Sequence, residues 1–374
     1  MAKKICFLFL LSLFAAEWMR AEEIRAVWLT TNYQLDWPTE AGVSEPVIRR
    51  QKAELIRMLD RLKEAGLNTV FFQARIRGTV FYKSALEKQS RFLTGKAGAE
   101  SEFDALAFAV EECHRRGMKC HAWMVCMPLG GKKYIQQNGL ADFVRKNSSF
   151  VTWHQGEYYL EPSAPQTAHY LASIAAEMVA NYAVDGVHLD YIRYPEKAGE
   201  YPDKKRYEAS GKQVSLPQWR RDNITRIVYA IYDRVKEVRS EAAVSSAPLG
   251  LYDGRFGKSY YGWNAFDAGF QEVERWLRED KHDFIAPMMY YKGVMFYPFV
   301  ADWCMRSYGK GVVPGLGIYR LNEKGTDWTV GEIEKQVWWS RQLGASGYAL
   351  FRARNLLDDH PALYWRLQYL NEEP

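Results

Sequence analysis

Short apolar segments alternate with segments of helical spacing along almost the whole chain after residue 24. The apolar segments are rich in β-branched and aromatic residues, which is typical of strands that are buried on both faces. This pattern predicts eight strands, over residues 25–31, 67–75, 118–125, 184–191, 242–248, 283–291, 311–319 and 345–352.

Helical spacing is clearest in residues 47–66, where Leu55, Leu59 and Leu62 fall on one apolar stripe and Gly66 marks the end. The same spacing recurs between most of the later strands. It predicts further helices over residues 101–117, 166–183, 218–239, 267–279, 330–344 and 357–370.

Eight strands that alternate with helices indicate a single (β/α)8 TIM-type barrel over residues 22–374. A doubly wound open sheet is the alternative, and it would lack the closing eighth unit. Long connections at residues 76–100, 126–164 and 192–217 all follow predicted strands. Such βα loops lie at the face where barrel enzymes build their active sites.

The first 21 residues have the layout of a secretory signal peptide, with a basic start, an apolar run and small residues. Removing them takes three basic and one acidic residue from totals of 50 and 45, which leaves a net charge of about +3. No later segment approaches the roughly 18 apolar residues of a membrane helix. We therefore expect a soluble exported protein, periplasmic or extracellular, with no nucleic-acid partner.

Several classes of chemistry lack their sequence signals. There is no G-x-S-x-G elbow, no P-loop and no G-x-G-x-x-G after a strand, which removes support for an esterase, an NTPase or a dehydrogenase. No C-x-x-C or His-rich spacing suggests a metal site, so we expect neither a metal nor a cofactor. The later cysteines are predicted to be buried free thiols.

Polar groups gather at the end of the fourth predicted strand, in V-D-G-V-H-L-D-Y-I-R-Y-P. Strand side chains alternate, so Asp190 and His188 point to the same face, where they could form an acid or base and its neighbour. Arg193 follows as a rim or loop anchor. The alternative is a structural salt bridge between Asp190 and Arg193, whereas Asp185 is expected to form a turn.

Other strand ends supply groups of the same kind. Aromatic rings that stack on the apolar faces of sugars, together with a few polar groups, are a common way to hold a carbohydrate. The predicted substrate-binding residues at these ends, besides Arg193, are Gln73, Arg75, His121, Trp123, Tyr290 and Tyr291.

A set of motifs in a fixed order resembles the glycoside hydrolase-like 10 family. The resemblance covers nearly all of the chain after the signal. The motifs are E-I-R-A-V-W-L-T-T, N-T-V-F-F-Q-A-R, S-R-F-L-T-G-K-A-G, H-R-R-G-M-K-C-H-A-W, Y-L-E-P, V-D-G-V-H-L-D-Y-I-R-Y-P and I-A-P-M-M-Y-Y.

The resemblance implies a TIM-type barrel in an exported bacterial protein that acts on glycans, with Asp190 as the catalytic acid. Its relatives include proteins that cut peptidoglycan strands stripped of their peptides, and a similar barrel occurs beside deacetylase domains that handle poly-N-acetylglucosamine. This chain departs from the family pattern in three places. Tyr191 stands where many relatives have a second acid, Met288 replaces a glutamine, and Met124 and Val125 replace Asn-Pro.

Glycoside hydrolysis ordinarily uses two carboxyl groups. With Asp190 as general acid and His188 beside it, Glu161 in Y-L-E-P is the first candidate partner, Asp253 the second and Asp36 the third. An acetamido group of the substrate could also replace a protein nucleophile. The sequence therefore predicts a glycoside hydrolase for an N-acetylated amino-sugar polymer such as denuded peptidoglycan, and the alternative is a non-catalytic glycan-binding barrel.

Overall fold

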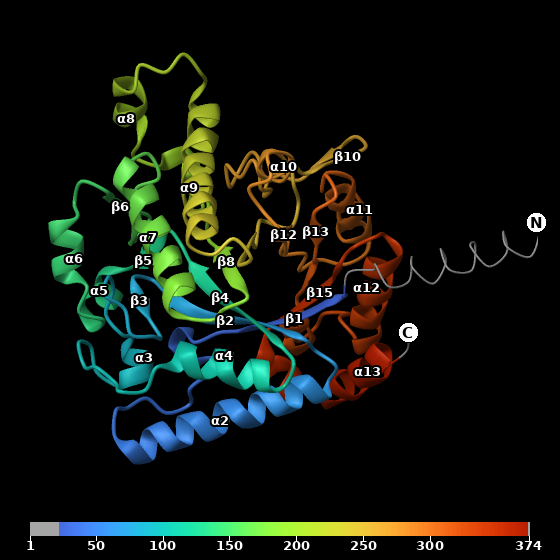
Figure 1. Ribbon diagram of the computed structural model, residues 1–374. Helices are drawn as coiled ribbons and strands as arrows, with labels where there is room; N and C mark the ends of the chain where they lie inside the picture. Colours follow the sequence, from blue (N-terminus) through green and yellow to red (C-terminus); the bar gives the residue numbers. More distant parts are fainter. Residues whose placement is uncertain (1–21, 373–374) are drawn as a thin grey trace, which may run out of the picture.

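Parallel strands form the centre of the protein in the computed structural model, which describes residues 22–372 (Figure 1). The predicted signal peptide lies outside the described residues. The parallel strands are β1 (Ile24–Leu29), β2 (Thr69–Ile76), β4 (Lys119–Val125), β8 (Gly186–Asp190), β9 (Ala243–Ser246), β12 (Phe284–Ile285), β13 (Gly311–Val312), β14 (Gly315–Leu316) and β15 (Gly347–Phe351).

The sheet closes into a barrel through an interrupted strand. Its order is β13-β12-β9-β8-β4-β2-β1-β15-β14, and the two end members, β13 and β14, are consecutive on the chain. Val313 donates its N–H to Ile285 on one side at 2.8 Å, and the carbonyl of Pro314 accepts from Ala349 on the other at 3.0 Å. The predicted TIM-type barrel is confirmed, and the open doubly wound sheet is excluded.

Helices lie around the outside of the strands (Figure 1). Those predicted from helical spacing are present, although the predicted helix 267–279 is shorter. The pattern missed α11, which lies between the sixth and seventh strands. The barrel helices are α2 (Glu45–Glu64), α4 (Ala105–Arg115), α7 (Pro165–Asn181), α9 (Leu216–Val238), α10 (Val273–Arg278), α11 (Tyr297–Met305), α12 (Val330–Gln342) and α13 (Pro361–Glu372).

The long connections carry structure that the sequence pattern did not predict. The connection after β4 forms a separate antiparallel sheet in the order β5-β7-β6. Short elements also occupy the connections after β2, β8 and β9. These additions are β3 (Thr79–Val80), α3 (Arg91–Thr94), β5 (Pro128–Gly130), α5 (Lys132–Gln137), α6 (Ala141–Lys146), β6 (Val151–His154), β7 (Glu157–Leu160), α8 (Lys204–Ala209), β10 (Arg255–Phe256) and β11 (Ser259–Tyr260).

β8 and β9 approach each other closely at Gly186, the first residue of β8. A Cβ atom at Gly186 would lie 2.4 Å from the carbonyl oxygen of Ala243 and 2.6 Å from Nδ1 of His121. Glycine is therefore required where β8 begins. From that point β8 runs for five residues, all of them buried, and ends at Asp190.

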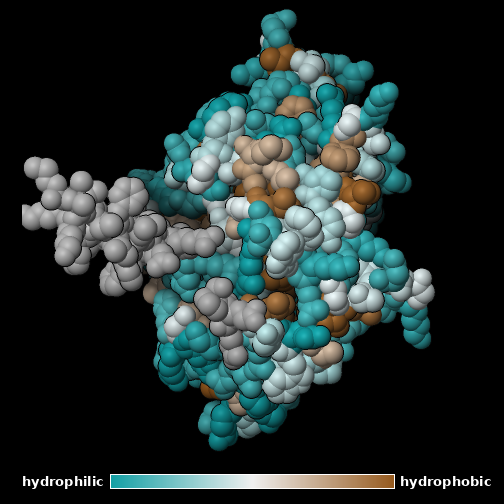
Figure 2. All heavy atoms as spheres, turned by 90° about the vertical axis from the view of Figure 1, so that its right-hand side faces the viewer, coloured by the Kyte–Doolittle hydropathy of each residue, from teal (hydrophilic) through white to brown (hydrophobic). Residues whose placement is uncertain are grey.

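The face that carries α12 and α13 is mainly polar. Figure 2 shows the apolar residues on this face as separate spots rather than one continuous patch. Within residues 22–372, no helix is both long and apolar enough to cross a membrane.

Candidate active site

Asp190 is a buried carboxyl group at the carboxyl end of β8, with 6% of its surface exposed. Its Oδ2 accepts a hydrogen bond from Nε1 of Trp123 at 3.1 Å, and its Oδ1 accepts one from the backbone N–H of Tyr191 at 2.7 Å. Burial raises the pKa of Asp190 to about 6 although both donors favour the ionised form. A carboxyl group with this pKa can hold a proton near neutral pH and give it to a leaving group.

Aromatic side chains lie at the end of β8, where Tyr191 follows Asp190 directly and Trp263 packs on the guanidinium of Arg193. Tyr191 and Trp263 are exposed by 42% and 38%, and Tyr290 packs against Phe351 with the ring centroids 5.4 Å apart. Burial, and secondly the charge of Asp190, raise the pKa of Tyr290 well above its usual value. The Tyr290 hydroxyl therefore stays protonated beside the acid. Such a wall of rings and hydroxyls suits the faces and edges of a sugar.

Arg193 lies at the same end of the barrel as Asp190, which is called the mouth below. Its guanidinium carbon is 4.6 Å from the ring centre of Tyr191 and 5.4 Å from that of Trp263. Among residues 22–372 no carboxylate lies within ion-pair distance of it, so the alternative of a structural salt bridge with Asp190 is not realised. Arg193 lowers the pKa of Asp190 only through space, and burial outweighs that effect.

His188 lies deeper in the barrel than the sequence pattern suggested. Nε1 of Trp28 donates to Nε2 of His188 at 3.1 Å, and Nδ1 of His188 is 2.9 Å from Oγ of Ser245. Its ring stacks on Phe71 at 4.0 Å, and burial holds its pKa well below the usual range. With both nitrogens engaged in the interior, His188 has no hydrogen bond to Asp190, which corrects its expected position at the rim.

His121 is also an interior group rather than a rim residue. Its ring packs edge-on against Phe71 and Phe284, with centroid distances of 5.7 and 5.6 Å. Burial lowers its pKa to about 4, so the imidazole is neutral at physiological pH.

Asp185 lies at the entry to β8. It accepts hydrogen bonds from the backbone N–H of Cys120 and from the ring of His114.

Gln73 and Arg75 do not form the shared sugar-facing surface that strict alternation predicted, because the pairing of β2 with β4 is irregular between them. Oε1 of Gln73 accepts from the backbone N–H of Thr31 and of Asn32, which orders the chain after β1. Arg75 is completely buried and pairs with Glu87 at 2.7 Å. Both side chains support the barrel wall.

Glu161, the first candidate for a partner carboxylate, is fully buried and engaged. Its Oε2 accepts from the hydroxyl of Thr152 at 2.6 Å and from that of Tyr201 at 3.3 Å, whereas Oε1 accepts from the hydroxyl of Ser163 at 2.7 Å. No hydrogen bond joins Glu161 to Asp190 in the described part of the chain. These contacts tie Glu161 to β6, to Ser163 just before α7 and to Tyr201 in the connection after β8, and they leave no open carboxylate edge.

The other two candidate partners are also held by neighbouring groups. Asp253 accepts from the backbone N–H of Arg255 at 3.0 Å and pairs with Arg306 at 3.5 Å. Asp36 is fully buried and pairs with Arg352. Burial still raises the pKa of Asp36.

A further carboxylate, Glu157 on β7, was missed by the sequence analysis. It pairs with Arg77 at 2.9 Å and accepts from the hydroxyl of Tyr159 at 3.2 Å. Burial raises the pKa of both Tyr191 and Tyr159, while the charge of Arg77 lowers the pKa of Tyr191 and the charge of Arg193 lowers that of Tyr159. Glu157 therefore lies near the end of the barrel that carries Asp190. The segment E-Y-Y-L, a carboxylate beside two tyrosines, was the available signal, but nothing in it shows that the connection after β4 folds back over the barrel.

Tyr291 is half-buried beside Gly250, and its backbone carbonyl accepts from Nε2 of Gln336 at 2.9 Å.

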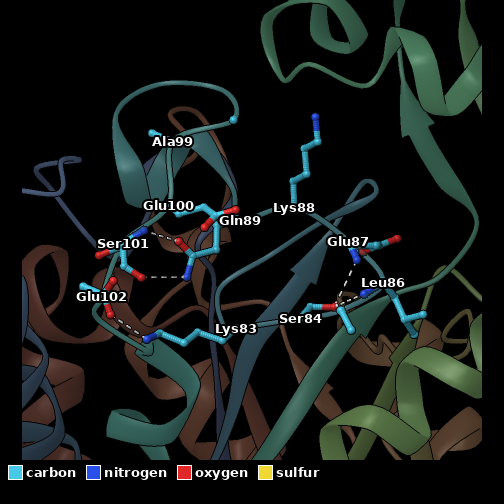
Figure 3. A pocket seen from close by; sticks show the side chains of 12 residues that line it. Lys83, Ser84, Leu86, Glu87, Lys88, Gln89, Ala99, Glu100, Ser101 and Glu102 are labelled. Atoms are coloured by element: carbon cyan, nitrogen blue, oxygen red, sulfur yellow. Dashed lines mark hydrogen bonds and ion pairs between the residues drawn. The ribbon is translucent and has the colours of Figure 1, made fainter.

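A cavity of about 690 Å³ lies between residues 83–89 and 98–102 (Figure 3). Its lining includes none of the predicted site residues. Within residues 22–372, no three His, Cys, Asp or Glu side chains are grouped so that they could hold a metal ion.

Comparison with known proteins gives the family. The model of the family described as Glycosyl hydrolase-like 10 matches residues 23–310. The chain belongs to this family. It is 30% identical over 349 residues to the glycosyl hydrolase YngK of Bacillus subtilis, covering 88% of this chain and 68% of that protein. It is 28% identical over 371 residues to the glycosyl hydrolase DigH of Escherichia coli O6:H1, covering 89% of this chain and 83% of the relative.

Solved structures agree with the fold. The PgaB glycoside hydrolase domain of Bordetella bronchiseptica superposes with a TM-score of 0.61 over 95% of this chain and all of that one. The sequence identity is 15%, so this likeness concerns the barrel itself. This family member thus shares its architecture with a glycoside hydrolase domain. Asp190 lies at the carboxyl end of a barrel strand, where such domains build their sites.

Proposed function

We propose that this family member is an exported glycoside hydrolase that cleaves an N-acetylated amino-sugar polymer, such as denuded peptidoglycan strands, with Asp190 as general acid. The observation that carries the proposal is the environment of Asp190, a buried carboxyl group with a pKa of about 6 at the carboxyl end of β8. Trp123 orients it, and the rings of Tyr191 and Tyr290 border it. A proton donor beside aromatic surfaces is what glycosidic bond cleavage needs.

The nucleophile in this proposal is the acetamido oxygen of the substrate or a water molecule. Glu161, Asp253 and Asp36 are each occupied by hydrogen bonds or ion pairs to protein groups. An acetamido group adjacent to the anomeric carbon would remove the need for a second protein carboxylate. His188 acts in this scheme as a support for the barrel interior beneath Asp190.

The test is the release of reducing ends from denuded peptidoglycan strands by the native protein and by Asp190→Asn. Loss of the general acid is expected to lower turnover by roughly 10²- to 10⁴-fold. Asp142→Asn is the matched control, since this carboxylate is exposed on α6 and pairs with Arg145 at 3.0 Å. Unchanged turnover by Asp190→Asn, with both variants folded, would show that another group supplies the proton.

A second function, glycan binding without cleavage, is favoured by one specific observation. The three carboxylates expected to assist Asp190 all make structural contacts. On this view the aromatic mouth binds oligosaccharides, and no products form under any condition. Binding by calorimetry together with product analysis by mass spectrometry separates the two functions, because any turnover that depends on Asp190 excludes the second.

A further inference from the structure

Arg193 differs from every other buried arginine in the described part of the chain. Four arginines of residues 22–372 are buried, and only Arg193 has no carboxylate within ion-pair distance. The other three form ion pairs: Arg75 with Glu87 at 2.7 Å, Arg220 with Asp203 at 2.7 Å and Arg221 with Glu272 at 3.8 Å.

The hydrogen-bonding capacity of Arg193 is also largely unused. A guanidinium group has five N–H donors. Nε of Arg193 has no partner, and NH1 donates only a long bond, of 3.4 Å, to the carbonyl of Tyr194. The group is 7% exposed and lies against the rings of Tyr191 and Trp263. These rings offset part of the desolvation of the charge, but they supply no anion.

The nearby carboxylates are engaged elsewhere. Asp190 accepts from Trp123 and from the backbone N–H of Tyr191, and Glu157 pairs with Arg77. Arg193 is close enough to Asp190 to lower the pKa of that acid through space. The unpaired positive charge therefore lies beside the group expected to protonate the glycosidic oxygen.

We propose that Arg193 binds a carboxylate carried by the glycan, which makes an acidic glycan the substrate class. A guanidinium matches a carboxylate through two parallel N–H···O bonds, which fixes the position of the sugar that carries it. Either a lactyl ether, as on muramic acid, or a uronic acid supplies this group. The inference rests on the proposed function, since it assumes that the mouth around Asp190 holds the glycan.

The test compares ligands that differ only in the carboxylate. Denuded peptidoglycan strands and the same strands with their lactyl carboxylates reduced to alcohols are titrated against the native protein, Asp190→Asn and Arg193→Met. The native protein and Asp190→Asn are expected to bind the carboxylated strands roughly 10- to 100-fold more tightly. Arg193→Met should bind both strands equally. An oligogalacturonate, used in the same titration, distinguishes a uronate from a lactyl group.

Arg221→Met is the matched control. Arg221 is 8% exposed and its guanidinium lies 4.2 Å from the ring centre of Phe266, but it already pairs with Glu272. This variant should keep the full preference for carboxylated strands. Arg193→Lys retains the charge without the bidentate geometry, so it should keep part of the preference.

Equal binding of both strands by the native protein would overturn the proposal without any variant, and so would a preference that survives in Arg193→Met. If Arg193→Met does not fold, the proposal is still tested by the affinities of the native protein for the two kinds of strand and by Arg193→Lys. Failure of the proposed hydrolase function looks different, because no reducing ends would then appear from any glycan while the binding preference remained.

Discussion

At the scale of single residues, opposing effects act on the carboxyl group of Asp190. Burial raises its pKa to about 6, while the N–H groups of Tyr191 and Trp123 and the charge of Arg193 lower it. The folded protein therefore binds this proton more tightly than the unfolded chain, whose aspartates have a pKa near 3.8. The stabilisation is fully present below about pH 4 and is lost as the pH rises through about 6, a change of about 3 kcal/mol.

This titration predicts the pH dependence of turnover. A general acid must be protonated, so kcat/KM should fall as the pH rises through about 6. Trp123→Phe removes a donor that favours the ionised form, so the falling limb should move upward by roughly one pH unit. The measurement is a pH profile of reducing-end release by the native and variant proteins.

Trp276→Phe serves as the control for the loss of an indole N–H. Trp276 is fully buried, and its Nε1 donates to the hydroxyl of Thr225 at 2.9 Å. It should lose stability without moving the falling limb. A limb that stays in place in Trp123→Phe would mean that the pH dependence belongs to a group other than Asp190.

At the scale of elements, β8 shows what periodicity can and cannot predict. Alternation correctly places His188 and Asp190 on one face, but it carries no information about depth. A strand rises about 3.3 Å per residue, so His188 lies roughly 7 Å below Asp190 and meets Trp28 and Ser245 instead of the mouth. The irregular pairing near Gln73 likewise defeats alternation, because a bulge changes which way the next side chain points.

The closeness of β8 and β9 yields a prediction about Gly186. In Gly186→Ala the new methyl group would meet the carbonyl of Ala243 at 2.4 Å, and backbone cannot move aside as a flexible side chain can. The free energy of unfolding should fall by about 1–3 kcal/mol or more. Urea denaturation measures this, with Gly199→Ala as control, because a methyl group there meets nothing within 4 Å. Equal midpoints for the two variants would contradict the close approach.

At the scale of the whole molecule, the order of strands and helices could be predicted because each unit has its own apolar pattern. The candidate site could be predicted only in part. Asp190 follows from its place at a strand end, whereas Glu157 and the engagement of Glu161 depend on how the connection after β4 folds into a sheet over the barrel. Such contacts join residues far apart in sequence, so no local pattern encodes them. The interrupted strand around Pro314 could not be anticipated for the same reason.

Closure of the barrel predicts that a change in the last helix reaches the first strand. Leu367 on α13 is completely buried, whereas Trp365 on the same helix is 61% exposed. Leu367→Ala should lower the free energy of unfolding by 2–5 kcal/mol, about the cost of a core cavity. α13 packs beside α12, α12 packs against β15, and β15 pairs with β1. Amide exchange should therefore quicken in β1 as well as in α13. Trp365→Ala should change both quantities little, since its ring is mostly in solvent. Faster exchange confined to α13 in Leu367→Ala would show that this helix opens independently of the closed barrel.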